Sequence, residues 1–271
     1  MITGQNQEIE MKNKAVPDYG LVSIIMPNYN AARFLEETVK SVLDQTYPYW
    51  ELLFVDDCST DDSLERIRQF RDDRIKVLCN ETNSGAAVSR NYALREAKGK
   101  WVAFLDSDDR WQPEKLMEQI LFMQKNNCHF SYTNYSRMDE ESRPIKGEIT
   151  GPCRVTKRKM FRYDYVGCLT VMYDREYVGL VQAEPSLRCR NDYALWLKVC
   201  KHCDCLLLDR NLACYRIRQN SLSHSGLGQK MYNQYRLFRV GESMSAVRAG
   251  WHTLNNLIFG VLKKLFYVKE A

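Results

Sequence analysis

Residues 101–111 read WVAFLDSDDRW, an apolar run that ends abruptly in a cluster of carboxylates. An uninterrupted apolar run bounded by a polar break is typical of a strand buried on both faces. Asp106, Asp108 and Asp109 follow it, and carboxylates this close repel one another unless a cation neutralises them. Oxygen ligands of this kind suit Mg²⁺ or Mn²⁺. For an aspartate triplet taken alone, a solvated acidic loop is the alternative interpretation.

Strand-like runs alternate with patterns of helical spacing in front of this stretch. The predicted strands are residues 21–26, 51–55, 75–79 and 101–105, and the predicted helices are residues 31–45, 60–70 and 88–97. Short connections between alternating strands and helices indicate a parallel sheet with right-handed crossovers and helices on both faces. The predicted fold class is therefore α/β, with a Rossmann-like, mostly parallel sheet flanked by helices.

Polar residues follow each predicted strand, at residues 27–30, 56–61, 83–85 and 106–109. In parallel sheets, ligands bind outside the carboxyl ends of the strands. The polar clusters are therefore expected to line one crevice at one edge of the sheet.

The composition is that of a soluble globular protein. The 271 residues are 45% hydrophobic and 27% charged, enough for one large α/β domain with an extension. The net charge of +5 lacks the clustered excess of a dedicated nucleic-acid binder, so no nucleic-acid partner is expected. Anionic substrates or an anionic membrane surface suit this balance. No apolar run is long enough to predict a transmembrane helix.

Ten cysteines are scattered through the chain. The polar residues 1–18 show no signal-peptide pattern, which favours a reducing, cytosolic compartment with free thiols. The tightest cluster, Cys200, His202, Cys203 and Cys205, lacks a second ligand pair at zinc spacing, so packing cysteines are the preferred interpretation.

The alternation of strand and helix loosens after residue 111. The predicted elements are helices at residues 113–126 and 192–201, a turn or short helix at 175–178, and strands at 129–138, 145–149, 168–173, 206–209 and 212–217. The C-terminal part then carries one apolar helical stripe with lysines beside it, formed by Leu254, Leu257, Ile258, Val261, Leu262, Leu265 and Phe266. Such a helix can lie in a membrane interface, and packing on the domain or on a second subunit in a homodimer is the equal alternative.

Five motifs in order carry a resemblance to a known family. They are VSIIMPNYN at residues 22–30, VDDCSTD at 55–61, NSGAAVSRN at 83–91, FLDSDD at 104–109 and NDYALWL at 191–197. Over residues 21–225 the chain resembles the inverting, GT-A fold nucleotide-sugar glycosyltransferases of family 2, of the type that builds bacterial surface polysaccharides. The resemblance implies a metal-dependent hexosyltransferase that uses a UDP-sugar donor and a glycan or lipid-linked acceptor.

The resemblance also implies a division of the chain. Residues 1–20 are expected to be a flexible leader, residues 21–225 the catalytic domain and residues 226–271 a helical, amphipathic C-terminal extension. Within the domain, residues 21–110 would form the nucleotide-binding half and residues 111–225 the acceptor half. The expected location is cytoplasmic, with peripheral attachment to the inner face of the cell membrane.

The donor nucleotide is assigned to the ends of the first two strands. The resemblance implies that Pro27 and Tyr29, with Asn30 beside them, wall the base pocket, where the Tyr29 ring offers a face for stacking. It assigns to Asp57 the acceptance of the uracil N–H, and to Asp56 a structural role. From the residues alone, a strand-ending turn and helix N-terminal charge explain the same positions.

The diphosphate and metal are assigned to the next two motifs. The resemblance makes Asp108 the direct ligand of Mn²⁺ or Mg²⁺ and Asp106 the ribose partner or a support for the metal. Asp109 either bonds the sugar or holds the turn. Arg90 either reaches the diphosphate or forms an ion pair with an aspartate. His224, in a polar loop, is an additional metal ligand or phosphate contact, or an ordinary solvated histidine.

The catalytic base implied by the resemblance is Asp192, which would take the proton of the attacking hydroxyl. Asn191 stands where the family commonly has Glu, which puts any role of a second carboxylate in doubt. A helix N-cap is the alternative role for Asp192. A nucleotidyltransferase and a non-catalytic nucleotide-sugar-binding homologue are the alternative functions, although PNYNAARF lacks the Gly-rich basic loop of the former.

Overall fold

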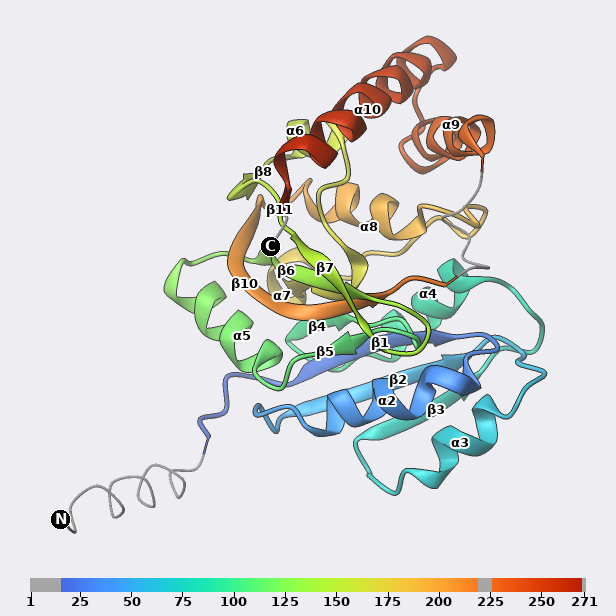
Figure 1. The fold of residues 1–271 in the computed structure, drawn as a ribbon, viewed down its shortest axis with the longest axis vertical. Coiled ribbons are helices and arrows are strands. Elements are labelled where there is room, and N and C mark those ends of the chain that lie inside the picture. Colours follow the sequence, from blue (N-terminus) through green and yellow to red (C-terminus); the bar gives the residue numbers. More distant parts are fainter. Residues whose placement is uncertain (1–15, 219–225, 270–271) are drawn as a thin grey trace, which may run out of the picture.

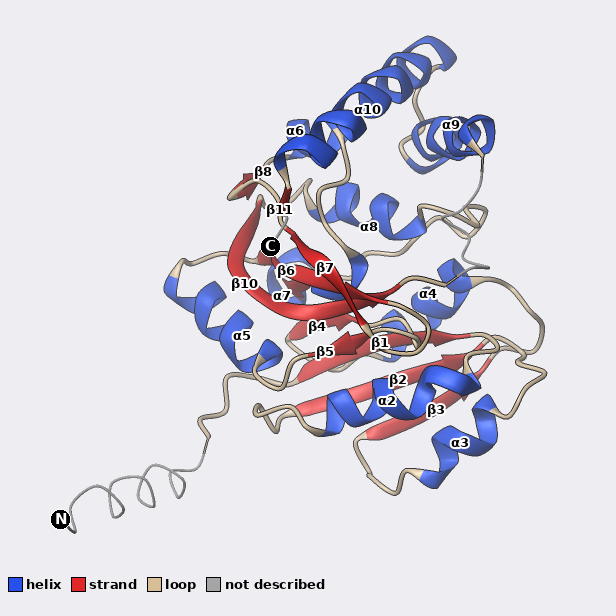
Figure 2. Cartoon of the chain, in the orientation of Figure 1, coloured by secondary structure: helices blue, strands red, loops and turns tan. Residues whose placement is uncertain are grey.

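A central sheet with helices on both faces forms the body of the protein (Figures 1 and 2). The computed structural model describes residues 16–218 and 226–269. The strands are β1 Val22–Asn28, β2 Trp50–Asp56, β3 Ile75–Cys79, β4 Trp101–Phe104, β5 Arg110–Trp111, β6 Phe130–Met138, β7 Pro144–Ile149, β8 Arg154–Val155, β9 Met172–Asp174, β10 Cys205–Arg216 and β11 Val268–Lys269. The α-helices are α2 Ala32–Leu43, α3 Ser63–Gln69, α4 Ala86–Glu96, α5 Lys115–Lys125, α6 Lys157–Arg162, α7 Arg175–Val178, α8 Asn191–Val199, α9 Leu227–Arg236 and α10 Ala246–Phe266.

The first four strands form the parallel part of the sheet, in the order β4-β1-β2-β3. Alternate residues of β1 and β2 enter two separate hydrophobic clusters: Ile25 and Leu53 lie in one, and Ile24 and Leu52 in the other. Helices α4 and α8 pack on the first cluster, and α2, α3 and α5 on the second. The predicted α/β class and the alternation over the first 105 residues are confirmed.

One glycine lets β4 enter beside β1. A Cβ at Gly99 would lie 2.6 Å from the Ser23 nitrogen and 2.7 Å from the Leu21 carbonyl, so only glycine fits there. The Gly99 N–H donates to Ser23 Oγ at 2.8 Å, which fixes the start of the strand that leads to the acidic loop.

The second half adds mostly antiparallel strands, so the sheet is mixed rather than mostly parallel. Strand β9 pairs antiparallel with both β4 and β6, and β7 is the antiparallel partner of β6. Two predictions are wrong. Residues 168–173 begin with a 3-10 turn, Cys168–Thr170, and only Met172–Asp174 is strand. The two final strands are one strand, β10, whose register against β6 shifts twice between Leu208 and Ala213.

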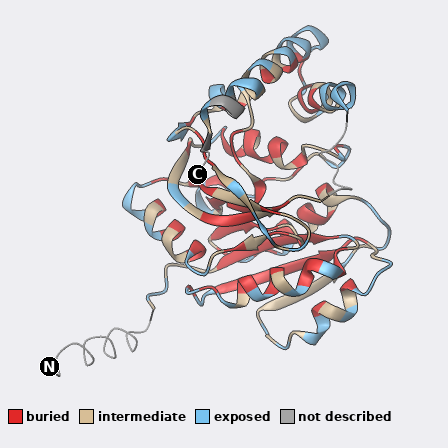
Figure 3. Cartoon of the chain, viewed as in Figure 1, coloured by how far each residue is buried: buried red, intermediate tan, exposed pale blue. Residues whose placement is uncertain are grey.

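The C-terminal segment folds onto the body near α6 and α8. Helix α9 leads through a π-helical turn, Leu237–Gly241, to α10, and the chain then returns to the sheet as β11, which pairs with β7. Figure 3 shows exposed residues along the outer side of α10, whereas the strands at the centre of the sheet are buried. Within the described residues, no helix combines the length and apolar character that crossing a bilayer requires.

Candidate active site

The ends of β1 and β2 are joined into one rigid ledge. Asn28 donates its side-chain amide to Asp56 Oδ1 at 2.8 Å, and Asp56 Oδ2 accepts the Ser59 N–H at 2.9 Å. Asn30, in the left-handed region with φ 49°, donates its N–H to Ser59 Oγ and accepts the Thr60 N–H at 2.8 Å. These bonds give Asp56 the structural surroundings expected for it and turn the Asn30 side chain toward the second strand.

Asp57 fastens the loop that follows β3. Its carboxylate accepts the Asn80 amide at 2.7 Å, the Ser84 N–H at 2.9 Å and the Gly85 N–H at 2.7 Å. The residue is 3% exposed. A carboxylate offers about four lone-pair positions, so three bonds leave one for a further donor such as an imide N–H. The fold therefore orients the Asp57 carboxylate and leaves one of its lone-pair positions for a ligand.

The predicted base-pocket residues differ in exposure. Pro27 is buried inside β1, whereas Tyr29 is 49% exposed just after it. An exposed phenol ring beside the Asn30–Ser59 bond is free to stack on a planar ligand. Of the two, only Tyr29 presents a large surface at this edge of the sheet.

Asp109 is the most enclosed carboxylate of the acidic loop. It is 1% exposed and accepts the Arg216 N–H at 2.8 Å, and its own carbonyl accepts the Thr38 hydroxyl at 2.8 Å. Burial, and then the charges of Asp108 and Asp106, raise the pKa of Asp109 well above its usual range. These contacts match the turn-holding interpretation of Asp109. A direct contact with the sugar stays a prediction.

Asp106 and Asp108 are the more accessible pair, with side chains 34% and 21% exposed. Each has an arginine partner. Arg90 pairs with Asp106 at 2.5 Å, and Arg218 pairs with Asp108 at 3.0 Å. Burial and the charge of Asp106 raise the pKa of Asp108, although Arg218 opposes them. Asp106 therefore lies close enough to disfavour the ionisation of Asp108, as a second ligand of one cation would.

Arg90 links the acidic loop to α8. It is buried, with one guanidinium nitrogen on Asp106 and another donating to Asn191 Oδ1 at 2.5 Å, and its Nε has no partner among the described residues. Burial alone would lower the pKa of Arg90, but negative charges, chiefly Asp106 and also Asp192, raise it overall. Of the two roles weighed for Arg90, the structure shows the ion pair.

Asp192 lies in the first turn of α8. Arg190, in the left-handed region with φ 59°, holds the N-cap position, so Asp192 is not the N-cap residue. Its carboxylate is partly exposed and accepts the adjacent Tyr193 N–H at 2.8 Å. The N-terminus of a helix stabilises negative charge. A partly exposed carboxylate thus stands within electrostatic reach of Arg90, the residue that also pairs with Asp106.

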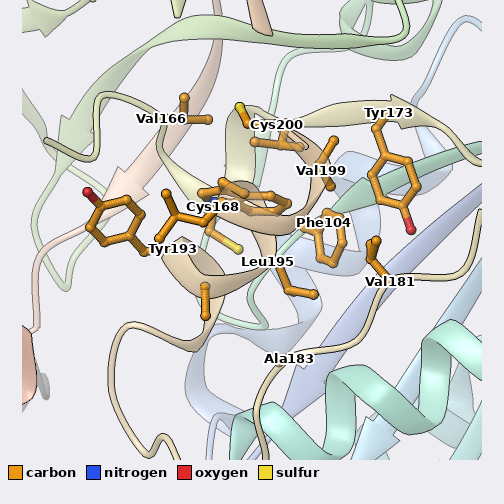
Figure 4. Close-up of a cluster of buried hydrophobic side chains, with 14 of the residues drawn as sticks. Phe104, Val166, Cys168, Tyr173, Val181, Ala183, Tyr193, Leu195, Val199 and Cys200 are labelled. Carbon is orange, nitrogen blue, oxygen red and sulfur yellow. The ribbon is translucent and has the colours of Figure 1, made fainter. Parts of the chain in front are cut away.

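A shared core fixes the acidic loop relative to α8. Phe104, the last residue of β4, packs edge-on against Trp196 of α8 with ring centroids 4.9 Å apart. Phe104 lies among Leu195, Tyr173 and Val181 in Figure 4. Because the acidic loop begins just after Phe104 and α8 begins one helical turn before Trp196, this contact sets the separation of the loop from the start of the helix.

Arg216 has a role that sequence reasoning missed. The sequence places Arg216 in the predicted strand at residues 212–217 without a role, and the structure shows it as the last residue of β10 with a fully buried side chain. It donates to the Asp108 carbonyl at 2.7 Å, to Ser142 at 2.8 Å and to Glu37 at 2.5 Å. Its main partner Glu37 is 179 residues away, so no local pattern could reveal the bond.

The residues present fit a divalent cation only together with a substrate. Among the described residues, no three His, Cys, Asp or Glu side chains are grouped as a metal site. Mg²⁺ is commonly held by one or two carboxylates with phosphate oxygens completing the shell, which is what Asp106 and Asp108 offer. His224 lies outside the described residues, so its contact with a metal or phosphate stays a prediction.

A family model described as glycosyl transferase family 2 matches residues 23–174, more than half of the chain. The chain belongs to glycosyltransferase family 2. The match spans β1 to β9 and therefore contains the two-strand ledge, the Asp57 loop and the acidic loop.

Similar curated proteins extend the match beyond the family model. This glycosyltransferase is 43% identical over 234 residues to TuaG of Bacillus subtilis (strain 168), whose name assigns it to teichuronic acid biosynthesis as a glycosyltransferase; 85% of this chain and 92% of TuaG are covered. It is 39% identical over 257 residues to WfgD of Escherichia coli, named as a UDP-Glc:α-D-GlcNAc-diphosphoundecaprenol β-1,3-glucosyltransferase, with 94% and 98% covered.

Solved structures share the fold at low identity. S. aureus TarS 1–349 in complex with UDP superposes with a TM-score of 0.67 at 22% identity, covering 87% of this glycosyltransferase and 70% of that chain. The mannosyltransferase PcManGT from Pyrobaculum calidifontis, in complex with GDP-Man and Mn²⁺, gives 0.62 at 16% identity, covering 95% and 81%. These likenesses confirm the GT-A fold, and the family match confirms the predicted family.

Proposed function

We propose that this glycosyltransferase transfers a hexose, with inversion, from a UDP-sugar to a hydroxyl of a lipid-linked glycan in bacterial surface polysaccharide synthesis. The observation that carries the proposal is the buried Arg90, which joins Asp106 of the acidic loop to α8 beside Asp192. The WfgD relative supports a lipid-linked acceptor and the UDP complex of TarS a uridine donor. We assign residues 21–110 to the donor and residues 111–225 to the acceptor, on the cytoplasmic side of the membrane.

The donor nucleotide would bind across the ends of β1 and β2. The remaining lone pair of Asp57 accepts the uracil N–H, a bond that cytosine cannot supply. The exposed Tyr29 ring stacks on the base, and the Asn30 turn beside it closes the pocket. Because three bonds already fix the Asp57 carboxylate, uridine recognition needs little rearrangement.

Asp108, supported by Asp106, would hold Mn²⁺ or Mg²⁺ on the donor diphosphate. When bound, the cation neutralises the negative charge that develops on the departing UDP. Arg218, which pairs with Asp108 at 3.0 Å in the structure, would be available beside it to donate to a phosphate oxygen of the donor. Asp109 keeps the loop attached to β10 throughout.

Asp192 would act as the general base. It accepts the proton of the acceptor hydroxyl while the hydroxyl oxygen forms a bond to the anomeric carbon. The bond from that carbon to the diphosphate oxygen breaks on the opposite face, its electron pair leaves with UDP, and the configuration inverts. Asn191 accepts a hydrogen bond from Arg90 of α4, so the residue before the base holds a cation instead of adding a second carboxylate.

We expect Asp192→Asn to retain UDP binding and to lose transfer by at least about 100-fold, because a general base contributes about 10²- to 10⁴-fold. Calorimetry with UDP and Mn²⁺ measures UDP binding. Release of UDP in the presence of a GlcNAc-diphospholipid acceptor measures transfer, with UDP-Glc, UDP-Gal, UDP-GlcNAc and UDP-GalNAc tested as donors. Asp62→Asn, at the exposed start of α3, is the matched control. Full transfer by the Asp192 variant would exclude it as the base.

The same titration tests the alternative of a non-catalytic binding homologue, because metal-dependent UDP binding without turnover by the native chain would favour that alternative. The nucleotidyltransferase alternative receives no support from the family match.

A further inference from the structure

Helix α10 turns its small and polar residues toward the body and its apolar residues outward. Its inward residues are Ala249, Thr253 and Asn256, each at most 6% exposed. Asn256 donates to the Tyr193 hydroxyl and to the Arg162 carbonyl, both at 3.3 Å. A surface helix of a soluble protein normally turns its apolar side to the core. Here the most buried side chains of the helix are small or polar, although Phe259 and His252 also contact the body.

The opposite side of α10 is apolar and open. Val247, Trp251, Leu254, Ile258 and Val261 are 84%, 64%, 52%, 52% and 62% exposed, and their spacing of three and four residues places them on one stripe. We call these five residues the outer face. Apolar patches left open on a protein surface mark sites of contact with another protein or with a membrane.

An apolar groove of about 310 Å³ continues the outer face toward α9. Leu254 of the outer face lines it together with Met231, Tyr232 and Tyr235 of α9. Of these, Met231 and Tyr232 are 39% and 55% exposed. The open apolar surface therefore extends over two helices, and aromatic rings with polar ends stand at its border, as is common at a membrane interface.

The charge of the chain is concentrated in the same segment. Residues 226–269 contain seven Lys and Arg and one Glu, a net charge of +6, whereas the whole chain carries +5. The remaining residues therefore sum to −1. The single Glu242 is already paired with Lys201 at 3.4 Å. The exposed cations Arg158, Lys159 and Arg162 of α6 add to this charge beside α10.

We propose that the outer face inserts into the interface of an anionic lipid bilayer, with the surrounding cations on the headgroups. Anionic headgroups attract each nearby Lys or Arg, and a buried apolar stripe supplies the rest of the attachment. A second copy of the chain fits less well, because a two-fold contact through this surface would bring two segments of +6 charge together. The inference is independent of the proposed donor and acceptor.

The chain contains a built-in reporter for this contact. Trp50, Trp101, Trp111 and Trp196 are each at most 3% exposed, and Trp251 is the remaining tryptophan. A blue shift of the intrinsic fluorescence on adding vesicles would therefore come from Trp251 entering an apolar environment. We expect the shift with vesicles of phosphatidylcholine containing about one third phosphatidylglycerol, and much less with phosphatidylcholine alone.

The deciding experiment is co-sedimentation of the full chain with these vesicles, without donor or acceptor. We expect the double variant Trp251→Glu with Ile258→Glu to bind at least about tenfold more weakly, because burying charged side chains in the interface is unfavourable. Val247→Glu, at the most exposed position of the stripe, tests the same face with the least risk to folding. Leu180→Glu, 50% exposed after α7, is the matched control and should bind normally.

Two results would overturn the proposal. The first is that the native chain binds neither kind of vesicle. A dimer in light scattering that dissociates in the double variant is the other, since it would assign the outer face to a second copy. Transfer to a short soluble acceptor should be unchanged in the double variant, which separates a failure of attachment from a failure of the proposed function.

Discussion

Asp108 and Asp109 are adjacent in sequence, yet the fold gives them different surroundings. Asp108 keeps 21% of its side chain exposed and pairs with Arg218, whereas Asp109 is closed in by the Arg216 backbone and by its neighbours. Spacing alone cannot distinguish them, because both follow the same strand. The difference arises from β10, which runs past the acidic loop and covers one carboxylate but not the other.

We expect Asp108→Asn to abolish the dependence of UDP binding on Mn²⁺ and Asp109→Asn to retain it. In the second variant the new carboxamide can still accept the Arg216 N–H, and the substitution removes a carboxylate whose charged form is disfavoured by burial. Calorimetric titration of UDP with and without Mn²⁺ measures both variants. Loss of metal-dependent binding in the Asp109 variant would restore the direct substrate or metal role that the sequence leaves open.

Lys115 is a buried amine with few partners. Its ammonium lies 4.0 Å from the centroid of the Trp111 ring and 3.5 Å from the Val171 carbonyl, and the residue is fully buried. Burial lowers the pKa of Lys115 well below its usual range. Between that lowered pKa and the unfolded value near about 10.4, the native state binds fewer protons than the unfolded state, so its stability rises with pH.

We therefore expect Lys115→Met to raise the free energy of unfolding at pH 7 by about 1–3 kcal/mol. The gain should shrink as the pH approaches about 10, where the unfolded amine also loses its proton. Urea denaturation at several pH values measures this. A gain that stays constant with pH would show that packing, rather than the charge, causes it.

The positions of several candidate site residues were predictable from sequence because their motifs are local. Asp57, Asp106, Asp108 and Asp192 each stand in a short motif at the end of a strand or the start of a helix, and the structure brings their motifs to one edge of the sheet. The partners of these residues were not predictable. Arg216 meets Glu37 and the acidic loop only because β10 and α2 become neighbours in the folded chain.

At the scale of elements, β4 and α8 behave as one unit. The edge-on contact of Phe104 with Trp196 joins them directly, and Arg90 of α4 adds a polar link from Asp106, just after β4, to Asn191 of α8. The geometry of the site therefore depends on a core contact as much as on its polar residues.

We expect Phe104→Ala to lower the free energy of unfolding by about 3–5 kcal/mol, because it leaves a cavity between β4 and α8. Transfer should fall further than the folded fraction explains, since the acidic loop loses its fixed distance to α8. Urea denaturation and the UDP-release assay measure the two effects. Leu121→Ala, 42% exposed on α5, is the control and should change stability by less than about 0.5 kcal/mol.

The predicted strands and helices match the structure over the first four strands and differ from it at two strands of the second half. The first four strands are short apolar runs between helical patterns, which only a parallel sheet accommodates. Residues 168–173 are also apolar, but the Thr170 hydroxyl bonds the Gly167 carbonyl and closes a 3-10 turn, which shortens the strand. The polar residues Arg210 and Asn211 separate two predicted strands, but β10 continues through them with shifted register.

At the scale of the whole molecule, charge and polarity are unevenly distributed. Residues 226–269 carry a net charge of +6, whereas the rest of the chain, which holds the acidic loop, is close to neutral. The amphipathic stripe and its lysines were visible in the sequence, but its direction was not, since a helical pattern does not tell which side meets the body. The inward Thr253 and Asn256 settle that the apolar side faces outward.

The bond from Asn256 to the Tyr193 hydroxyl has a consequence for the distance between Asp192 and a bilayer bound by α10. Tyr193 follows Asp192 in α8, and the chain after α10 is attached to the sheet again where β11 pairs with β7. The C-terminal helices are therefore held against the body at two places. An enzyme resting on a bilayer through α10 would hold Asp192 at a constant height above the lipid. It would then transfer sugar to acceptor hydroxyls at one distance from the lipid diphosphate and not to the ends of longer glycans.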